Sequence, residues 1–157
     1  MMLRLLFALA LTAAPLPALA QEVLAEYWAS SGSLPPEYAW DVTVTIATDG
    51  KITLKHCKGY ETEGPGCKIR KGKATTDKVQ AIREAALASG LIDRPARTAE
   101  DIMVGGGATG GKVWIDGAEI VLPSQPAAAD ADRVATVLSA IRSAIPDRLA
   151  RKFIEGN

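Results

Sequence analysis

The chain contains little of what most catalytic sites need. It has one histidine, His56, and two cysteines among 157 residues. It has no G-x-S-x-G elbow, no HExxH helix and no free cysteine to pair with the histidine. Glu100 and Asp101 are adjacent, and neighbouring carboxylates rarely converge on one substrate bond. We therefore expect a protein that is not an enzyme, with no cofactor and no metal site. A hydrolase that uses scattered Asp, Glu or Lys is the less favoured alternative.

The chain also lacks an excess of charge of one sign. Eighteen Lys and Arg balance 18 Asp and Glu, so the net charge is zero. Such a balance is not typical of a nucleic-acid-binding protein. Charge is nevertheless uneven along the chain, because residues 51–73 hold seven basic and two acidic side chains.

No hydrophobic run is long enough to span a bilayer comfortably. The apolar run Leu5–Ala14 follows Arg4 and precedes the small-residue pattern Ala18-Leu19-Ala20, which is typical of a signal peptide. We predict that residues 1–20 are removed by cleavage near Ala20. The remaining protein, residues 21–157, is expected to be one periplasmic or secreted domain without a transmembrane segment.

The two cysteines, Cys57 and Cys67, are predicted to form a disulfide. Their spacing is not CxxC, which argues against a thioredoxin-type role. A disulfide that closes roughly eleven residues stabilises a fold by about 3 kcal/mol. Two interpretations stay open: the bond presents the loop Lys58–Gly66 to a partner, or it only staples a small exported domain.

A β-hairpin is predicted around the turn Thr48-Asp49-Gly50. Apolar residues alternate with polar ones on both sides of this turn. A three-residue loop pairs Ile46 with Ile52, Val44 with Leu54 and Val42 with His56, so all the apolar side chains share one face. Gly50 then supplies the positive φ of a bulged turn. A further short strand near Cys67–Lys71 is expected to fold back beside the second strand.

A second hairpin is predicted over Lys112–Leu122. The two-residue turn Asp116-Gly117 pairs Ile115 with Ala118 and Val113 with Ile120. Trp114 lies on the other face of this hairpin. It is either a partner contact or a packing partner of Tyr27 or Trp28.

The glycine-rich run before this hairpin partly matches a phosphate-binding loop. Residues 106–112 fit G-x-x-x-x-G-K, but Val113 stands where the loop needs Ser or Thr. A strand is expected after it, whereas a phosphate-binding loop leads into a helix. We therefore interpret Gly105–Gly111 as a flexible linker or hairpin approach.

Helices are predicted over residues 75–90, with Asp77 as the N-cap, and over residues 129–145. Residues 146–157 are expected to form a short C-terminal helix or tail. In the aromatic N-terminal segment, residues 21–40, a short helix is predicted at Glu22–Ser30. The fold class is therefore α+β. It is a small antiparallel sheet built from two hairpins, a possible ββα pseudo-repeat, with two long helices on one face and one disulfide.

From these features we expect a non-catalytic protein-binding module, such as an inhibitor, assembly factor or accessory subunit, whose partner is another envelope protein. The alternative is a binder of an anionic envelope polymer or lipid head group through residues 51–73. Six candidate contact residues follow from the two hypotheses: Tyr60, Lys68, Arg70, Lys71, Lys73 and Trp114.

Overall fold

The computed structural model describes residues 22–154, with side chains as far as residue 151. The predicted signal peptide lies outside these residues. The strands are β1 (Val23–Ser30), β2 (Trp40–Ala47), β3 (Lys51–Lys58), β4 (Cys67–Lys73), β5 (Ala108–Ile115) and β6 (Ala118–Leu122). The helices are α1 (Thr76–Ala88), α2 (Ala131–Ala144), which follows a short 3-10 turn, and α3 (Asp147–Ile154).

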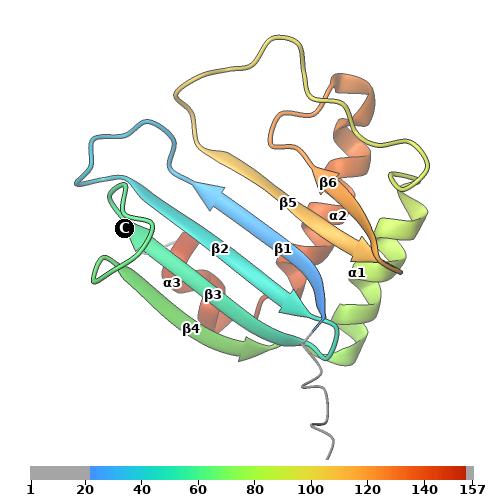
Figure 1. The fold of residues 1–157 in the computed structure, drawn as a ribbon, viewed down its shortest axis with the longest axis horizontal. Coiled ribbons are helices and arrows are strands. Elements are labelled where there is room, and N and C mark those ends of the chain that lie inside the picture. Colours follow the sequence, from blue (N-terminus) through green and yellow to red (C-terminus); the bar gives the residue numbers. More distant parts are fainter. Residues whose placement is uncertain (1–21, 155–157) are drawn as a thin grey trace, which may run out of the picture.

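All six strands form one antiparallel sheet in the order β4-β3-β2-β1-β5-β6. Figure 1 shows the three helices behind this sheet, so one face of the sheet packs against them. The α+β class, the long helices on one face and the disulfide between Cys57 and Cys67 are confirmed. The two predicted hairpins are not neighbours, because β1 lies between them and pairs with both β2 and β5.

The predicted helix at Glu22–Ser30 is wrong, because this segment is the central strand β1. Its register with β2 shifts between Val23 and Ala25. As a result, the consecutive residues Leu24 and Ala25 are both buried, which breaks the period-two pattern of a strand. The remaining apolar spacing imitates a helix, so periodicity gives the wrong element here.

Both hairpin registers are confirmed. Ile46 pairs with Ile52 and Val42 with His56 across the first turn, where Gly50 has φ 83°. In the second hairpin, Val113 pairs with Ile120 across a turn in which Asp116 and Gly117 both have positive φ. Positive φ at both central residues is the geometry of a type I′ turn.

The helices close the core over the rear face of the sheet. On α1 the buried residues are Val79, Ile82 and Ala86, as the predicted apolar stripe requires. Thr75 rather than Asp77 is its N-cap residue, and Asp77 lies in the first turn, where a negative charge suits the helix dipole. None of the helices in residues 22–154 is long and apolar enough to cross a membrane.

The C-terminal helix α3 docks on the sheet through Leu149, which is buried. A Cβ on Gly72 would lie 2.6 Å from the Cδ1 atom of Leu149, so the glycine lets the helix approach β4 closely. This contact also shows which side of β4 faces the helices.

The glycine-rich run is only partly a loop. β5 begins at Ala108, so the flexible-linker prediction is wrong for Gly110 and Gly111. A Cβ on Gly110 would lie 2.5 Å from the indole of Trp28, so this glycine lets the aromatic ring lie close against the strand. The run leads into a strand, not into the helix that phosphate binding requires.

Candidate partner-binding surface

Three segments lie along one end of the sheet (Figure 1). Residues 31–39, between β1 and β2, have residues 59–66, between β3 and β4, on one side and residues 102–107, before β5, on the other. The amide of Gly59 donates to the carbonyl of Ala39 at 2.8 Å, which joins the first two. A Cβ on Gly32 would lie 2.2 Å from the carbonyl oxygen of Gly106, so the first and third are also in contact. We call these segments together the three-loop edge.

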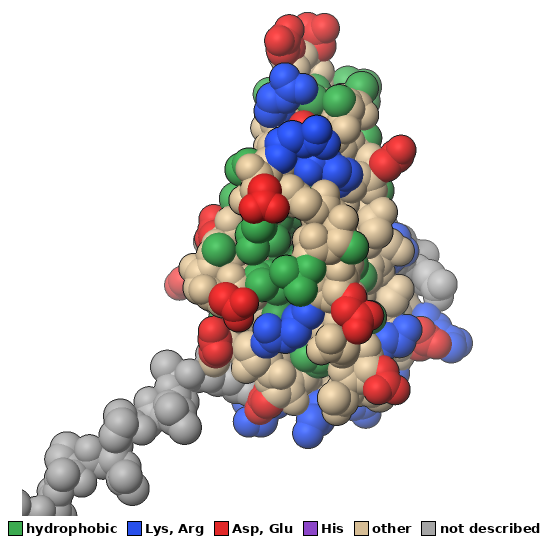
Figure 2. All heavy atoms as spheres, turned by 90° about the vertical axis from the view of Figure 1, so that its right-hand side faces the viewer, with side chains coloured by type: hydrophobic (Ala, Val, Ile, Leu, Met, Phe, Trp, Pro, Cys, Tyr) green, Lys and Arg blue, Asp and Glu red, His purple; other side chains and the backbone are tan. Residues whose placement is uncertain are grey.

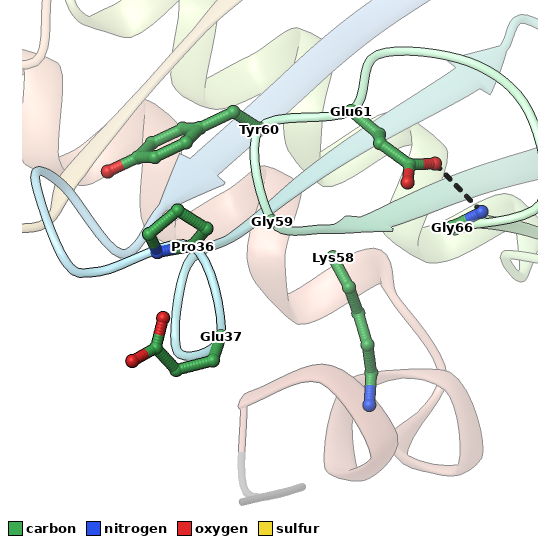
Figure 3. Close-up of a pocket in the computed structure, with 7 residues that line it drawn as sticks. All are labelled: Pro36, Glu37, Lys58, Gly59, Tyr60, Glu61 and Gly66. Atoms are coloured by element: carbon green, nitrogen blue, oxygen red, sulfur yellow. Dashed lines mark hydrogen bonds between the residues drawn. The ribbon is translucent and has the colours of Figure 1, made fainter.

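The disulfide anchors the middle loop at its base. Cys57 and Cys67 are directly paired across β3 and β4, with their Cα atoms 4.0 Å apart. Next to the bond, the amide of Lys58 donates to the carbonyl of Gly66 at 3.1 Å. The carboxylate of Glu61 accepts from the amide of Gly66 at 3.0 Å (Figure 3). These bonds across the loop hold it in one conformation.

Exposed apolar side chains concentrate on the three-loop edge. Ten large apolar residues are exposed in the described part of the chain, and six of them lie here: Leu34, Tyr38, Tyr60, Ile102, Met103 and Val104. The other four are spread over β4, α1, the turn after α1 and β6. Single exposed apolar residues are ordinary, whereas large contiguous apolar patches are typical of interaction sites.

A shallow depression of about 590 Å³ lies between the first two loops. Figure 3 shows the ring of Tyr60 beside Pro36, with Glu37 and Lys58 below them. The hydroxyl of Tyr60 donates to the carbonyl of Leu34, which fixes the ring across the loops. The depression therefore offers an apolar wall beside charges of both signs.

The side chain of Gln125 holds the third segment with a pair of hydrogen bonds like those between neighbouring β-strands. The Gln125 Nε2 atom donates to the carbonyl of Met103 at 2.7 Å, and the Met103 amide donates to Gln125 Oε1 at 2.7 Å. The main chain around Gln125 continues the pairing, because the Ala99 amide donates to the Gln125 carbonyl at 2.8 Å. Met103 is thus fixed in place although its own side chain faces solvent.

Asp130 holds the chain that leads to the third segment, through a hydrogen bond to Arg97. It is the one buried charged residue in the described part of the chain. Its carboxylate accepts from the Arg97 amide at 3.0 Å and from the Arg133 guanidinium. Arg133 also donates to the carbonyls of Ser89 and Arg94, at the end of α1 and beyond it. The Arg97 amide, helped by Arg133, lowers the pKa of Asp130.

The predicted contact residues do not form one patch. Tyr60 lies on the three-loop edge, but Trp114 is half-buried in β5, on the front sheet face that points away from the helices. The basic residues of β4 are divided between the two faces. Lys71 and Lys73 pair with Thr53 and Lys51 on the front face. Lys68 and Arg70 pair with His56 and Leu54 on the helix side.

His56 is partly buried and has several basic neighbours. Burial lowers its pKa, and the charges of Lys58, Lys68 and Arg70 lower it further, against an opposing effect of Asp41. In residues 22–154, no three His, Cys, Asp or Glu side chains are grouped as a metal site would need.

No model of a known protein family matches this chain, and no curated protein is significantly similar to it in sequence. The interpretation of the surface therefore depends on its own geometry. Sequence patterns did not predict that Gln125 and Asp130 hold these loops by hydrogen bonds. Asp130 could have been suspected from its position before α2, but its partner Arg97 is 33 residues away.

Proposed function

We propose that this protein is an exported, non-catalytic protein-binding module, and that it binds its partner through the three-loop edge. The observation that carries this proposal is the grouping of six exposed apolar residues on segments held by hydrogen bonds and a disulfide. An inhibitor, an assembly factor or an accessory subunit of the cell envelope would each use such a surface. The disulfide supports an oxidising compartment outside the cytosol.

The composition of the surface suits a protein partner. Aromatic residues and methionine are enriched where proteins bind one another, and Tyr38, Tyr60 and Met103 supply them here. Because the loops are already fixed, little conformational entropy is lost on binding. Recognition loops on a rigid sheet are a common arrangement for this purpose.

The proposal is tested by capture of a partner from solubilised envelope. Purified, oxidised protein is immobilised, and retained proteins are identified at low and moderate salt. We expect one protein in stoichiometric amount at both salts, and loss of it in Tyr60→Glu and Met103→Glu variants. Leu87→Glu, which adds the same charge at an exposed site on α1, is the matched control. Equal capture by all three variants would contradict the three-loop edge as the binding surface.

A second candidate function has its own observation. The front faces of β3 and β4 carry Lys51, Lys55, Lys71 and Lys73, and neither strand contains an acidic residue. Binding of an anionic envelope polymer or lipid head group would use this strip. Lysines on the edge strand β4 also protect it against pairing with another chain, which is the simpler explanation.

The salt dependence of binding distinguishes the two candidate functions. Polymer binding by the lysine strip should weaken at moderate ionic strength, because exposed charges are screened there. A Lys71→Glu/Lys73→Glu variant should lose polymer binding, whereas Lys68→Glu, on the helix side, should not. Polymer binding unchanged in the first variant would exclude the lysine strip as the binding site.

A further inference from the structure

We infer that the edge strand β4 binds an extended acidic segment of a partner protein, which pairs with it as an added strand. This inference rests on the proposed protein-binding function and assigns it a second surface, outside the three-loop edge. It is carried by the position of β4 in the sheet, by the direction of its main-chain polar groups and by the charge around them.

The main chain of β4 points a row of polar groups away from the sheet. This strand lies at the border of the sheet and pairs with β3 (Figure 1). The Lys58 amide donates to the Gly66 carbonyl, and along an antiparallel pair hydrogen-bonded positions alternate with positions that are not. In this register Arg70 points its amide and carbonyl toward β3, whereas Ile69 and Lys71 point theirs outward. In the described part of the chain, no residue hydrogen-bonds to those outward groups.

The charge at this edge decides which strand can pair with it. β4 contains four basic residues, Lys68, Arg70, Lys71 and Lys73, and neither β4 nor β3 contains an acidic one. A second copy of the chain would bring the same basic residues to the edge, so like charges oppose self-pairing. An acidic strand meets opposite charges instead. The residues that exclude one kind of chain therefore select the other.

A depression of about 420 Å³ lies at this edge, and its lining residues are Arg70, Lys71, Arg148 and Leu149. Neighbours in a strand point to opposite faces, so a depression lined by both Arg70 and Lys71 opens at the outer border of β4. Arg148 is exposed in the first turn of α3, where the acidic residue Asp147 pairs with Arg151 at 3.7 Å. The depression thus offers basic groups to alternate side chains of an added strand.

Ile69 gives the front face of this edge an apolar contact. Its side chain is 66% exposed and points to the same face as those of Lys71 and Lys73. A β-branched side chain of the added strand can pack on Ile69, while acidic side chains approach the basic groups. The partner segment is therefore expected to alternate acidic residues with Val or Thr.

The test titrates oxidised protein with a fluorescent synthetic peptide of about ten residues, in which Glu alternates with Val and Thr. One control peptide has Lys in place of Glu. A second has Pro in place of Val and Thr, so it keeps the charge but lacks amides for strand pairing. Fluorescence anisotropy gives the dissociation constant, and NMR gives amide hydrogen exchange. We expect binding of the acidic Val/Thr peptide alone, with slower exchange of the Ile69 and Lys71 amides in the complex.

Variants assign the binding to the edge. Ile69→Pro removes an outward amide, which an edge strand tolerates, and should raise the dissociation constant at least about threefold. Ile69→Val keeps the amide and should leave the constant unchanged. Arg148→Glu, outside the strand, should raise it roughly three- to tenfold. Arg94→Glu, the same charge reversal at an exposed residue beyond α1, should not. Circular dichroism should be the same for all four variants.

Three results would overturn the inference: no binding of the acidic Val/Thr peptide, equal binding of the Pro peptide, or unchanged exchange at Ile69 and Lys71. A dimer of the free protein that Ile69→Pro dissociates would assign the edge to a second copy and would also overturn it. Tyr60→Glu and Met103→Glu should leave peptide binding unchanged, because both residues lie on the three-loop edge. Failure of this inference is therefore distinguishable from failure of the proposed function.

Discussion

At the scale of single residues, two polar side chains hold main-chain segments of the loops in place by hydrogen bonds. Gln125 and Asp130 both act in this way, and both hold segments far from them in sequence. Neither role follows from a motif, since any amide or carboxylate could fill it. Whether such a side chain holds a distant main-chain segment depends on the distance between the two in the folded chain, which a single sequence does not give.

His56 gives a prediction about pH. Its pKa is lowered in the folded protein, so the unfolded chain takes up a proton first as the pH falls. The free energy of unfolding should therefore decrease as the pH drops below about 6.5 and level off below the lowered pKa. Urea unfolding between about pH 4 and 8 measures this, and NMR of the single imidazole gives the pKa directly.

A His56→Gln variant is the control, because it removes the only titrating imidazole in the chain. It should lose the decrease near pH 6 and keep the fall at lower pH that carboxylates cause. An imidazole pKa above about 6.5 in the folded protein would contradict the assignment.

At the scale of elements, the packing of β1 on β5 depends on Gly110. A Cβ there would lie 2.5 Å from the indole of Trp28 and 2.9 Å from the carbonyl oxygen of Leu122. Gly110→Ala should therefore destabilise the protein by about 1–3 kcal/mol, the usual cost of overpacking. Gly106→Ala is the matched control, since a Cβ at Gly106 meets nothing within 4 Å. Equal stability of the two variants in urea unfolding would show that Trp28 does not occupy this position.

The disulfide gives a second prediction at this scale. A Cys57→Ser/Cys67→Ser variant should lose about 3 kcal/mol of stability, because the bond no longer restricts the unfolded chain. The β3–β4 pairing should remain, since its main-chain register does not need the bond. Chemical denaturation measures the loss, and the original protein under reductant should lose the same amount.

Sequence patterns predicted the elements that alternate cleanly and missed the one that does not. The hairpins around Gly50 and Gly117 have one register that puts every apolar side chain on one face, and the structure has that register. β1 was not predicted as a strand, because its bulge buries the consecutive residues Leu24 and Ala25. Gly110 and Gly111 were assigned to a loop by composition, although β1 on one side and β6 on the other make them part of a strand.

The candidate site was predictable only in part. The loop closed by Cys57 and Cys67 and the exposure of Tyr60 follow from local sequence, and both lie on the three-loop edge. The contribution of residues 31–39 and 102–107 depends on the order of strands in the sheet, since β1 brings its own loop between the other two. Side-chain direction on β4 divides Lys68 and Arg70 from Lys71 and Lys73, which the run of basic residues alone did not reveal.

At the scale of the whole molecule, the sheet separates a covered face from a front face and gathers three loops at one end. The side that carries α1 shows a group of apolar side chains with acidic and basic side chains around it (Figure 2). The three-loop edge differs, because six of the ten exposed large apolar residues lie there. This contrast is the basis of the central claim, that the protein binds a protein partner through this end.

Photo-crosslinking in the cell envelope tests that claim most directly. A photoreactive phenylalanine analogue is placed singly at Tyr38, Tyr60 and Met103, and at the control position Leu87 on α1. The account predicts the same partner adduct from all three edge positions and none from the control. Adducts from Leu87 alone, or from none of the four positions, would contradict it.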